Sequence, residues 1–366
     1  MCKPEERQIK VSVVMPIYNA YAYLRPALDS VLDQTMAEIE LICVDDGSTD
    51  HSLDILKEYQ QRDARVRIIT ENNAGPAIAR NRGLSRSRGE YVIFLDADDF
   101  YEPTLLEKLY ELAVEKSLDI AISDYDIYNS HTAKFEHNIS AEHAEIFAGD
   151  KVVSKSIYPN EIFQCVSNYV WNKMFRRAFL AEKELTFDEE LRVFEDVYFV
   201  MTSLSLASAI GKADEVLIHH RIYSAQSKQR LFKKYYAQVP LIYQRIKEFL
   251  MKNGMYAPLS QSFLNLSASR AYKIYNLLWR DAKGELWDLY HNTFAESLGW
   301  GSAEPDYFDN PDVRDFCANV LIYTHDQFEK RESRGQKLDI RAVGQKLRIR
   351  ERLRRLKSFF CRGGKD

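Results

Sequence analysis

Residues 92–100 read Val-Ile-Phe-Leu-Asp-Ala-Asp-Asp-Phe, a short apolar run that ends at three carboxylates within four positions. The β-branched and aromatic residues at 91–95 are typical of a strand covered on both faces, as in a parallel sheet. In open α/β sheets, ligands bind beyond the carboxyl ends of the strands. The stretch therefore predicts an α/β domain in which one strand delivers Asp96, Asp98 and Asp99 to a ligand site.

Three carboxylates this close repel one another unless a cation or hydrogen-bond donors neutralise them. Hard oxygen ligands suit Mg²⁺ or Mn²⁺, so the cluster is a candidate site for one of these ions. The alternative is a solvated acidic loop that caps the helix expected after Pro103, because Asp is common at helix N-termini.

A calcium-binding EF-hand loop would place ligands at Asp96, Asp98 and Glu107, its positions one, three and twelve. That interpretation fails at positions five and six, where Phe100 and Tyr101 stand in place of a ligand and a turn glycine. A metal site completed by the phosphates of a bound ligand fits the pattern better.

The composition is that of a globular protein of 366 residues, with 46% hydrophobic and 28% charged residues. This length allows a catalytic domain and a smaller appended one. The sequence contains no apolar run near the length of a membrane span and no N-terminal signal peptide, so a cytoplasmic protein is expected. Five cysteines without a C-x-x-C pair indicate reduced, packed thiols.

Charge is distributed unevenly along the chain. Residues 331–366 hold 13 Lys and Arg against 4 Asp and Glu, which leaves the preceding 330 residues near −13 because the whole chain carries −4. A basic tail on an acidic body indicates an anionic surface as partner and argues against nucleic-acid binding by the body.

Strands and helices alternate in the first hundred residues. Strands are predicted at 11–15, 41–44, 66–69 and 91–95, with helices at 22–34, 51–61 and 77–87. This alternation predicts βαβ units and a doubly wound, mainly parallel sheet. Neither G-x-G-x-x-G nor G-x-x-x-x-G-K occurs, which argues against a Rossmann dehydrogenase and a P-loop kinase. Two strands that end in acids, at Asp45-Asp46 and at 96–99, suggest a sugar nucleotide as ligand.

Four ordered motifs carry a resemblance to a known family: S-V-V-M-P-I-Y-N at 12–19, V-D-D-G-S-T-D at 44–50, G-P-A-I-A-R-N-R-G at 75–83 and F-L-D-A-D-D-F at 94–100. The chain resembles inverting family 2 glycosyltransferases of the GT-A fold, of the type that builds bacterial surface polysaccharides. The resemblance covers about residues 10–227 and includes V-W-N-K-M-F-R-R at 170–177 and F-E-D-V-Y-F at 194–199. It implies transfer of a sugar from a nucleotide-sugar, expected to be a UDP-sugar, to a glycan or a lipid-linked saccharide.

The resemblance also implies roles for residues of the nucleotide-binding half, at about 10–125. A carboxylate can accept the N3–H of uracil and an aromatic ring can stack on the base. Asp98 is implied to touch the ribose or the metal, and Asp99 the Mn²⁺ or Mg²⁺ that bridges the diphosphate; Asp45 and Asp50 are expected to be structural. The implied nucleotide ligands are Pro16, Tyr18, Asn19, Asp46, Arg80 and Asp98.

The acceptor half, at about 126–227, is implied to supply the general base. Asp196 is the candidate, and its neighbour Glu195 is expected to brace Arg192 or a backbone donor; the alternative is a pair of acids that complement a helix dipole. One base opposite one leaving group implies inversion. Trp171, Asn172 and Lys173 are implied to form an acceptor-side wall, where Lys173 could meet a phosphate, with a core position as the alternative for Trp171. His219 and Arg221 are candidates near the diphosphate. Asp96 is a further donor-side or acceptor-side candidate.

Beyond residue 227 the family motifs end. Residues 228–335 predict a helical domain whose aromatic spacing indicates core packing. In the tail, 336–366, residues 346–360 predict a basic amphipathic helix, which is typical of binding to anionic membranes. The protein would then be peripheral on the inner face of the membrane with a lipid-linked acceptor; the alternative is a tail helix packed on the helical domain.

Two other classes of protein are weighed against the transferase. A nucleotidyltransferase acting on sugar phosphates would need a glycine-rich basic loop after the first strand, where this chain has 16–19, Pro-Ile-Tyr-Asn. A non-catalytic nucleotide-sugar-binding protein would not need the full set of carboxylates that the motifs supply.

Overall fold

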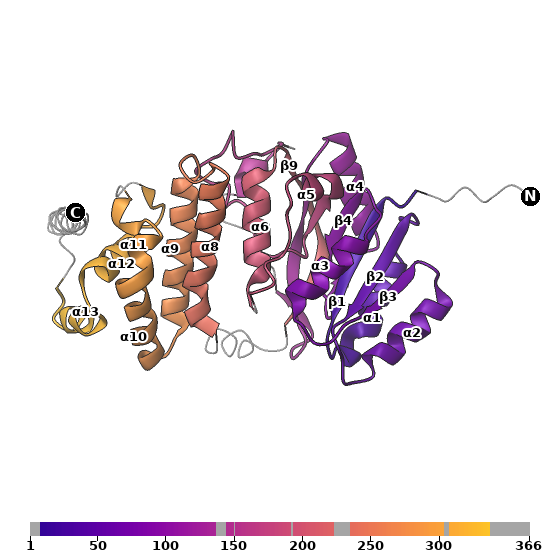
Figure 1. Ribbon diagram of the computed structural model, residues 1–366, viewed down its shortest axis with the longest axis horizontal. Coiled ribbons are helices and arrows are strands. Elements are labelled where there is room, and N and C mark those ends of the chain that lie inside the picture. The colour runs from indigo at the N-terminus through magenta and orange to yellow at the C-terminus, as the bar shows by residue number, and fades with distance from the viewer. Residues whose placement is uncertain are drawn as a thin grey trace, which may run out of the picture. The chain divides into compact units, whose positions relative to one another are not determined.

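The computed structural model describes residues 8–136, 144–149, 151–191, 193–222, 235–303 and 307–336 (Figure 1). The chain divides into two compact units. The first comprises Met1–Lys228 with Phe249–Leu259, and the second comprises Gln229–Glu248 with Ser260–Asp366. The predicted tail helix at 346–360 lies outside the described residues.

Nine strands of the described chain form one mixed sheet in the first unit, in the order β3-β2-β1-β4-β8-β6-β9-β5, with β7 paired to β6. The strands are β1 (Val11–Ile17), β2 (Ile39–Asp45), β3 (Val66–Thr70), β4 (Tyr91–Phe94), β5 (Phe100–Tyr101), β6 (Ile120–Asn129), β7 (Lys134–Glu136), β8 (Lys173–Arg176) and β9 (Ile210–Ile222). The four strands predicted in the first hundred residues are all present and pair in parallel.

The first strand extends further than the sequence predicts, because β1 continues through Pro16 to Ile17. Pro16 has no N–H to donate to a neighbouring strand. At this point β1 is paired only with β2, since its pairing with β4 ends at Val14. Pro is tolerated where one side of a strand needs no donor, so the residue does not end the strand.

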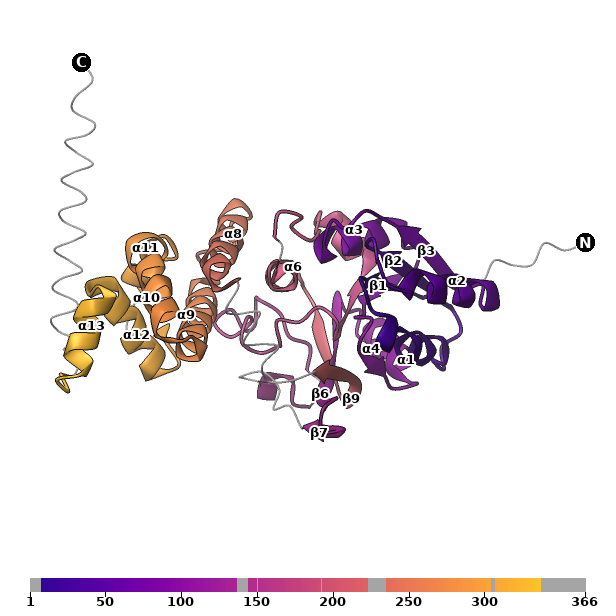
Figure 2. The same ribbon diagram turned by 90° about the horizontal axis from the view of Figure 1, so that it is seen from below.

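Helices cover both faces of the parallel strands, with α3 (Pro76–Arg86) on one side and α1 (Tyr21–Leu32) and α4 (Leu105–Glu115) on the other (Figure 2). The alternation of side chains along each strand explains this. Val13 and Met15 face a large core that includes α1 and α4, whereas Ile42 and Val44 pack with Ala79 of α3. Strands buried on both faces are therefore apolar throughout, as the sequence of β4 predicts.

The helices of the first unit include the three predicted at 22–34, 51–61 and 77–87, each within two residues of its predicted bounds, and the one expected after Pro103. They are α1 (Tyr21–Leu32), α2 (Ser52–Arg62), α3 (Pro76–Arg86), α4 (Leu105–Glu115), the 3₁₀ turn η1 (Ala144–Phe147), α5 (Arg177–Glu182) and α6 (Glu195–Leu206).

The second unit is helical in its described part. Its elements are η2 (Tyr236–Gln238), α8 (Val239–Lys252, whose last residues from Phe249 count with the first unit), α9 (Ser260–Leu277), α10 (Arg280–Leu289), the π-helical turn η3 (Tyr290–Phe294), α11 (Ala295–Ser297), η4 (Trp300–Ser302), α12 (Pro311–Ile322) and α13 (His325–Glu332). Trp287 and Tyr290 are fully buried, as the aromatic spacing predicts, whereas Trp279, which was expected in the same core, is 43% exposed. Among the described helices, none is both long enough and apolar enough to cross a membrane.

Close packing of α3 on β1 depends on Gly83, where an added Cβ would lie 2.2 Å from Val14 Cγ1. Val14 is β-branched and buried in a central strand, so its side chain has little freedom to move. We expect Gly83→Ala to lower the free energy of unfolding by about 1–3 kcal/mol, measured by urea unfolding.

A double-mutant cycle tests whether contact with Val14 causes this loss of stability. The cost of Gly83→Ala should shrink by about 1 kcal/mol when Val14 is also alanine. Should Gly83→Ala leave stability unchanged or raise it, as helix propensity alone would predict, the contact between α3 and β1 is not tight.

Candidate active site

A cavity of about 610 Å³ opens at the carboxyl ends of β1, β2 and β4, beside the start of α3. Parallel strands bring these ends to one edge of the sheet, which is where the sequence predicted a ligand site. Seven of the predicted site residues line this cavity: Pro16, Tyr18, Asn19, Asp46, Arg80, Asp96 and Asp98.

One end of the cavity combines an exposed aromatic ring with a buried carboxylate. Tyr18 is 51% exposed, which leaves a ring face free for a flat ligand. The Asp46 carboxylate is buried and accepts hydrogen bonds from the backbone N–H groups of Ala74 (2.7 Å) and Gly75 (2.8 Å). Each carboxylate oxygen keeps a further lone pair, so Asp46 can also accept a ligand N–H.

The loop after β1 is tied to the loop after β2 by Asn19. Its Oδ1 accepts from the N–H of Thr49 at 2.8 Å, and its backbone adopts the left-handed φ of 50°. Asp50 accepts from the N–H of Tyr21 at 3.0 Å and Asp45 from that of Ser48 at 3.3 Å. Asp45 and Asp50 thus have the structural roles expected of them, and Asn19 shapes the cavity wall through the same network.

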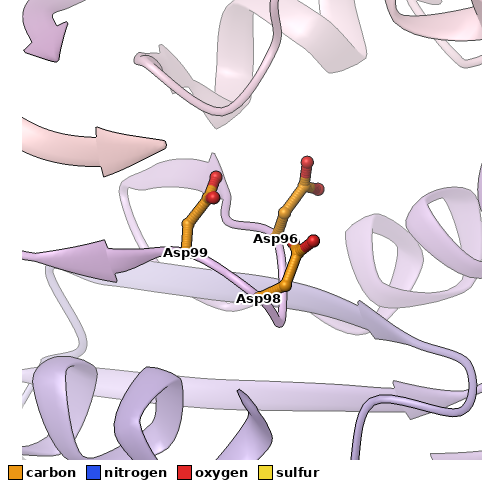
Figure 3. A group of neighbouring side chains, drawn as sticks. All are labelled: Asp96, Asp98 and Asp99. Atoms are coloured by element: carbon orange, nitrogen blue, oxygen red, sulfur yellow. The ribbon is translucent and has the colours of Figure 1, made fainter. Parts of the chain in front are cut away.

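The acidic loop after β4 presents its three carboxylates on one side (Figure 3). One oxygen from each of Asp96, Asp98 and Asp99 lies within 4.8 Å of the others, close enough for a shared cation. This donor set of three carboxylates fits Mg²⁺ or Mn²⁺. Asp96 and Asp98 also line the cavity, so a ligand there could complete the coordination.

Asp99 is the buried member of the acidic loop, with 1% of its surface exposed. Its Oδ1 accepts from the backbone N–H of Arg221 at 2.8 Å, and His220 Nδ1 lies 3.1 Å from both of its oxygens. Burial raises the pKa of Asp99 to about 6, although the neighbouring His220 opposes the shift. Asp99 therefore attaches the acidic loop to β9 in addition to any role at a metal.

Arg80 of α3 lies between the acidic loop and α6. Its Nη2 donates to Asp96 at 2.9 Å and its Nη1 donates to Glu195 at 2.6 Å. Glu195 was expected to brace Arg192 or a backbone donor; its observed partner is Arg80, and Arg192 lies outside the described residues. Arg80 is 6% exposed and lines the cavity, and one N–H of each terminal nitrogen is used by a protein carboxylate.

Asp196, the candidate base, stands in the first turn of α6. It is partly exposed and does not line the cavity, but it follows Glu195, which Arg80 connects to the cavity wall. Desolvation and the adjacent Glu195 raise the pKa of Asp196 to about 7, against the opposing charge of Arg80. A carboxylate with a pKa near neutrality is suited to proton transfer.

Trp171, Asn172 and Lys173 were expected to form an acceptor-side wall, and the structure corrects this. All three are buried, because the segment leads into β8, which begins at Lys173 and is inserted between β4 and β6 in the middle of the sheet. Trp171 stacks on Tyr169 and His220, which is the alternative core role.

The Lys173 ammonium is enclosed by oxygen acceptors and cannot meet a phosphate in this position. It donates to the carbonyls of Ser167 (2.8 Å) and Tyr169 (2.7 Å) and to Asn172 Oδ1 (2.7 Å). Burial lowers the pKa of Lys173 to about 7, although the charge of Asp196 opposes the shift.

His219 and Arg221 were expected near the diphosphate, but neither lines the cavity. Both lie in β9, whose pairing with β5 and β6 turns them toward protein partners. His219 contacts Asp126 through Nδ1 (2.6 Å) and Glu102 through Nε2 (2.9 Å).

The guanidinium of Arg221 holds the acidic loop through a backbone carbonyl. Its Nε donates to the carbonyl of Asp98 at 2.8 Å, and the group lies over the rings of Tyr23, Phe100 and Tyr128. Tyr23 lines the cavity as well and was not predicted. The signal that could have found it is the cluster of three tyrosines, 18, 21 and 23, beside the first motif.

Comparison with known proteins agrees with these motifs. Residues 12–182 match Glycosyl transferase family 2. The putative glycosyltransferase EpsH of Bacillus subtilis is 32% identical over 247 residues, which are 67% of this chain and 70% of that protein. A poly(ribitol-phosphate) beta-glucosyltransferase of Bacillus spizizenii is 25% identical over 316 residues, covering 84% of this chain and 47% of that protein.

Solved structures share the fold. The structure of S. aureus TarS 1-349 in complex with UDP-GlcNAc aligns with a TM-score of 0.70 and 20% identity, covering 90% of this chain and 93% of that chain. The same protein was solved in complex with UDP, with a TM-score of 0.68 and the same coverage. The predicted fold, a mainly parallel GT-A-like sheet followed by helices, is confirmed.

Proposed function

The chain belongs to glycosyltransferase family 2, and from this premise we propose that it moves a sugar from a UDP-sugar to a hydroxyl group of a glycan, with inversion and with help from a divalent cation. The observation that carries the proposal is one cavity lined by Tyr18 and Asp46, which follow β1 and β2, and by Asp96 and Asp98, which follow β4. A nucleotide-sugar needs both kinds of contact, because its base is flat and its diphosphate is strongly anionic.

The side chains of Tyr18 and Asp46 support uracil as the base of the donor. The ring of Tyr18 can stack on the base, and Asp46 can accept its N3–H with the lone pairs that the backbone leaves free. TarS, which shares the fold, was solved with UDP and with UDP-GlcNAc, so the proposed donor has a precedent on this scaffold.

Asp98 and Asp96 would hold the cation at the diphosphate end, with Asp99 as the third carboxylate of the set. When bound, Mg²⁺ or Mn²⁺ would neutralise charge on the departing nucleoside diphosphate, a Lewis-acid effect that lowers the barrier to its departure. Arg221 keeps the acidic loop in place by its bond to the carbonyl of Asp98.

Asp196 would remove the proton from the acceptor hydroxyl as that oxygen attacks the anomeric carbon. Its pKa of about 7 means that a substantial fraction is ionised near neutral pH. A single base facing a single leaving group supports direct displacement, and therefore inversion. Only one member of the Glu195–Asp196 pair is needed for this role, since Glu195 is bonded to Arg80.

The acceptor is proposed to be a glycan or a lipid-linked saccharide at the inner face of the membrane. One relative is named as a poly(ribitol-phosphate) beta-glucosyltransferase, which is a precedent for a polymeric acceptor. The basic sequence of 331–366, with 13 Lys and Arg, supports contact with an anionic membrane.

A panel of UDP-, GDP-, CDP- and dTDP-sugars tests the proposal. We expect Mn²⁺- or Mg²⁺-dependent release of UDP from one UDP-sugar, through slow hydrolysis without an acceptor and faster with oligosaccharide acceptors. The product distinguishes the competing classes. Release of pyrophosphate from a nucleoside triphosphate and a sugar phosphate would indicate a nucleotidyltransferase, and binding of UDP-sugars without turnover would indicate a non-catalytic protein.

A further inference from the structure

We propose that Arg80 is a positioning residue that fixes the general base to the acidic loop, with Glu195 as its contact on α6. The inference rests on the proposed function in one respect, that Asp196 is the base. It assigns Arg80 to the alignment of two protein segments, a role that the resemblance does not imply.

The geometry places one guanidinium across two segments that are distant in sequence. Arg80 is 16 residues from Asp96 and 115 residues from Glu195, and its two terminal nitrogens are bonded to these two carboxylates. Its guanidinium carbon lies 5.5 Å from the centroid of the Phe187 ring. Arginine suits this position because its planar fork can serve two acceptors at once.

The buried Nε of Arg80 has no hydrogen-bond partner among the described residues. The two ion pairs of the guanidinium direct Nη1 to Glu195 and Nη2 to Asp96, so its orientation does not depend on a contact at Nε. Contact with both carboxylates therefore determines its position.

The first turn of α6 needs an external support. Its N-cap residue, Phe194, has the left-handed φ of 57° and offers no side-chain cap, and in the first turn the N–H of Val197 donates to Asp196 Oδ1. A non-glycine residue in this conformation is held by its surroundings. The ion pair from Arg80 to Glu195, the first residue of α6, supplies such a contact directly before Asp196.

The same arrangement sets the charge around Asp196. Two carboxylates, Glu195 and Asp96, disfavour its ionised form, and Arg80 favours it. Lys173 of β8 is a further basic group that interacts with it. Removing the charge of Arg80 should therefore raise the pKa of Asp196, whereas removing the charge of Glu195 should lower it.

Three variants distinguish the effect of charge on Asp196 from the effect of how Asp196 is positioned. Arg80→Met removes the charge and both contacts, and Glu195→Gln removes one negative charge while keeping an acceptor for Arg80. Arg80→Lys keeps the charge but replaces the fork with a single ammonium, which cannot reproduce both contacts. Arg82→Met is the matched control, because Arg82 lies two residues along α3, is exposed and pairs only with Glu71 among the described residues.

The first measurement needs neither substrate nor turnover. In metal-free protein with ¹³C-carboxyl aspartate, the Asp196 signal is identified by its loss in Asp196→Asn and titrated by NMR. We expect the pKa of Asp196 to rise by about 1 pH unit in Arg80→Met and to fall by a similar amount in Glu195→Gln. Arg80→Lys and Arg82→Met should stay near the wild-type value.

The second measurement is kinetic. At a pH above the pKa of Asp196 in every variant, Arg80→Lys and Arg80→Met should lower kcat by about 10- to 100-fold, because the base is misplaced. The KM for the donor should change little, and Arg82→Met should match wild type.

The two hypotheses fail in different ways. The positioning role is overturned if the Asp196 pKa is the same in Arg80→Met, Glu195→Gln and wild type, or if Arg80→Lys retains full kcat. A wild-type protein without any transferase activity would instead overturn the proposed function, while the NMR titration would still decide whether Arg80 and Glu195 govern Asp196. If Arg80→Met fails to fold, Glu195→Gln and Arg80→Lys carry both measurements.

Discussion

Replacing Asp196 by asparagine is expected to lower turnover by about 10²- to 10⁴-fold, the usual effect of losing a general base. Asparagine keeps the shape of the side chain and can still accept from the N–H of Val197, which is 2.8 Å from Asp196 Oδ1 in the native protein. It cannot take a proton from the acceptor hydroxyl. Because Asp196 does not line the cavity, UDP affinity should be nearly unchanged.

Initial rates of sugar transfer and calorimetry with UDP measure the two effects separately. Glu190→Gln is a suitable control, since it removes an exposed carboxylate a few residues before α6. Transfer close to the wild-type rate in Asp196→Asn would exclude Asp196 as the base. A collapse of UDP affinity in the same variant would mean that the residue maintains the cavity.

Asp98→Asn is expected to lower turnover by about 10³-fold, because several kcal/mol of charge stabilisation at the diphosphate would be lost with the cation. A neutral amide is a much poorer ligand for Mg²⁺ or Mn²⁺ than a carboxylate. UDP should bind more weakly than to wild type when the cation is present. When EDTA is present, the two proteins should bind UDP alike.

The variant Asp98→Asn tests metal binding more directly than a substitution of Asp99. Asp99→Ala is also expected to abolish transfer, but it would leave the buried N–H of Arg221 without its partner and release the loop from β9. Calorimetry with and without EDTA distinguishes the two variants. An equal loss of affinity under both conditions in Asp98→Asn would mean that Asp98 supports the loop and is not a metal ligand.

The sequence alone predicted the part of the site that depends on strand order and strand ends. Apolar runs followed by acids at 41–46 and 92–99 predict parallel strands with carboxylates at one edge of the sheet. Local chain direction is enough for this inference, because parallel strands joined by helices must bring their carboxyl ends together. Pro16, Tyr18, Asp46, Asp96 and Asp98 accordingly line one cavity.

Residues from later parts of the chain could not be placed in this way. Lys173 and His219 lie on β8 and β9, and their surroundings depend on which strands insert between which others. From its charge, Lys173 was predicted to meet a phosphate. The strand that contains it lies between β4 and β6 and is buried, and the Lys173 ammonium is enclosed by carbonyl oxygens. No local pattern carries that information, since it arises from the pairing of distant segments.

Arg80 shows the division between sequence and tertiary structure most clearly. The motif G-P-A-I-A-R-N-R-G places it on the helix beside the cavity, and the structure agrees. Its partners Asp96 and Glu195 are determined by folding, because α3, the acidic loop and α6 meet only when the sheet is assembled. The sequence by itself thus determined the family, the fold class and the residues at the carboxyl ends of the first strands. The tertiary structure alone decided which charged side chains face the cavity and which form ion pairs with each other. A buried charge is costly unless it is paired, and its partner is set by the segments that pack around it.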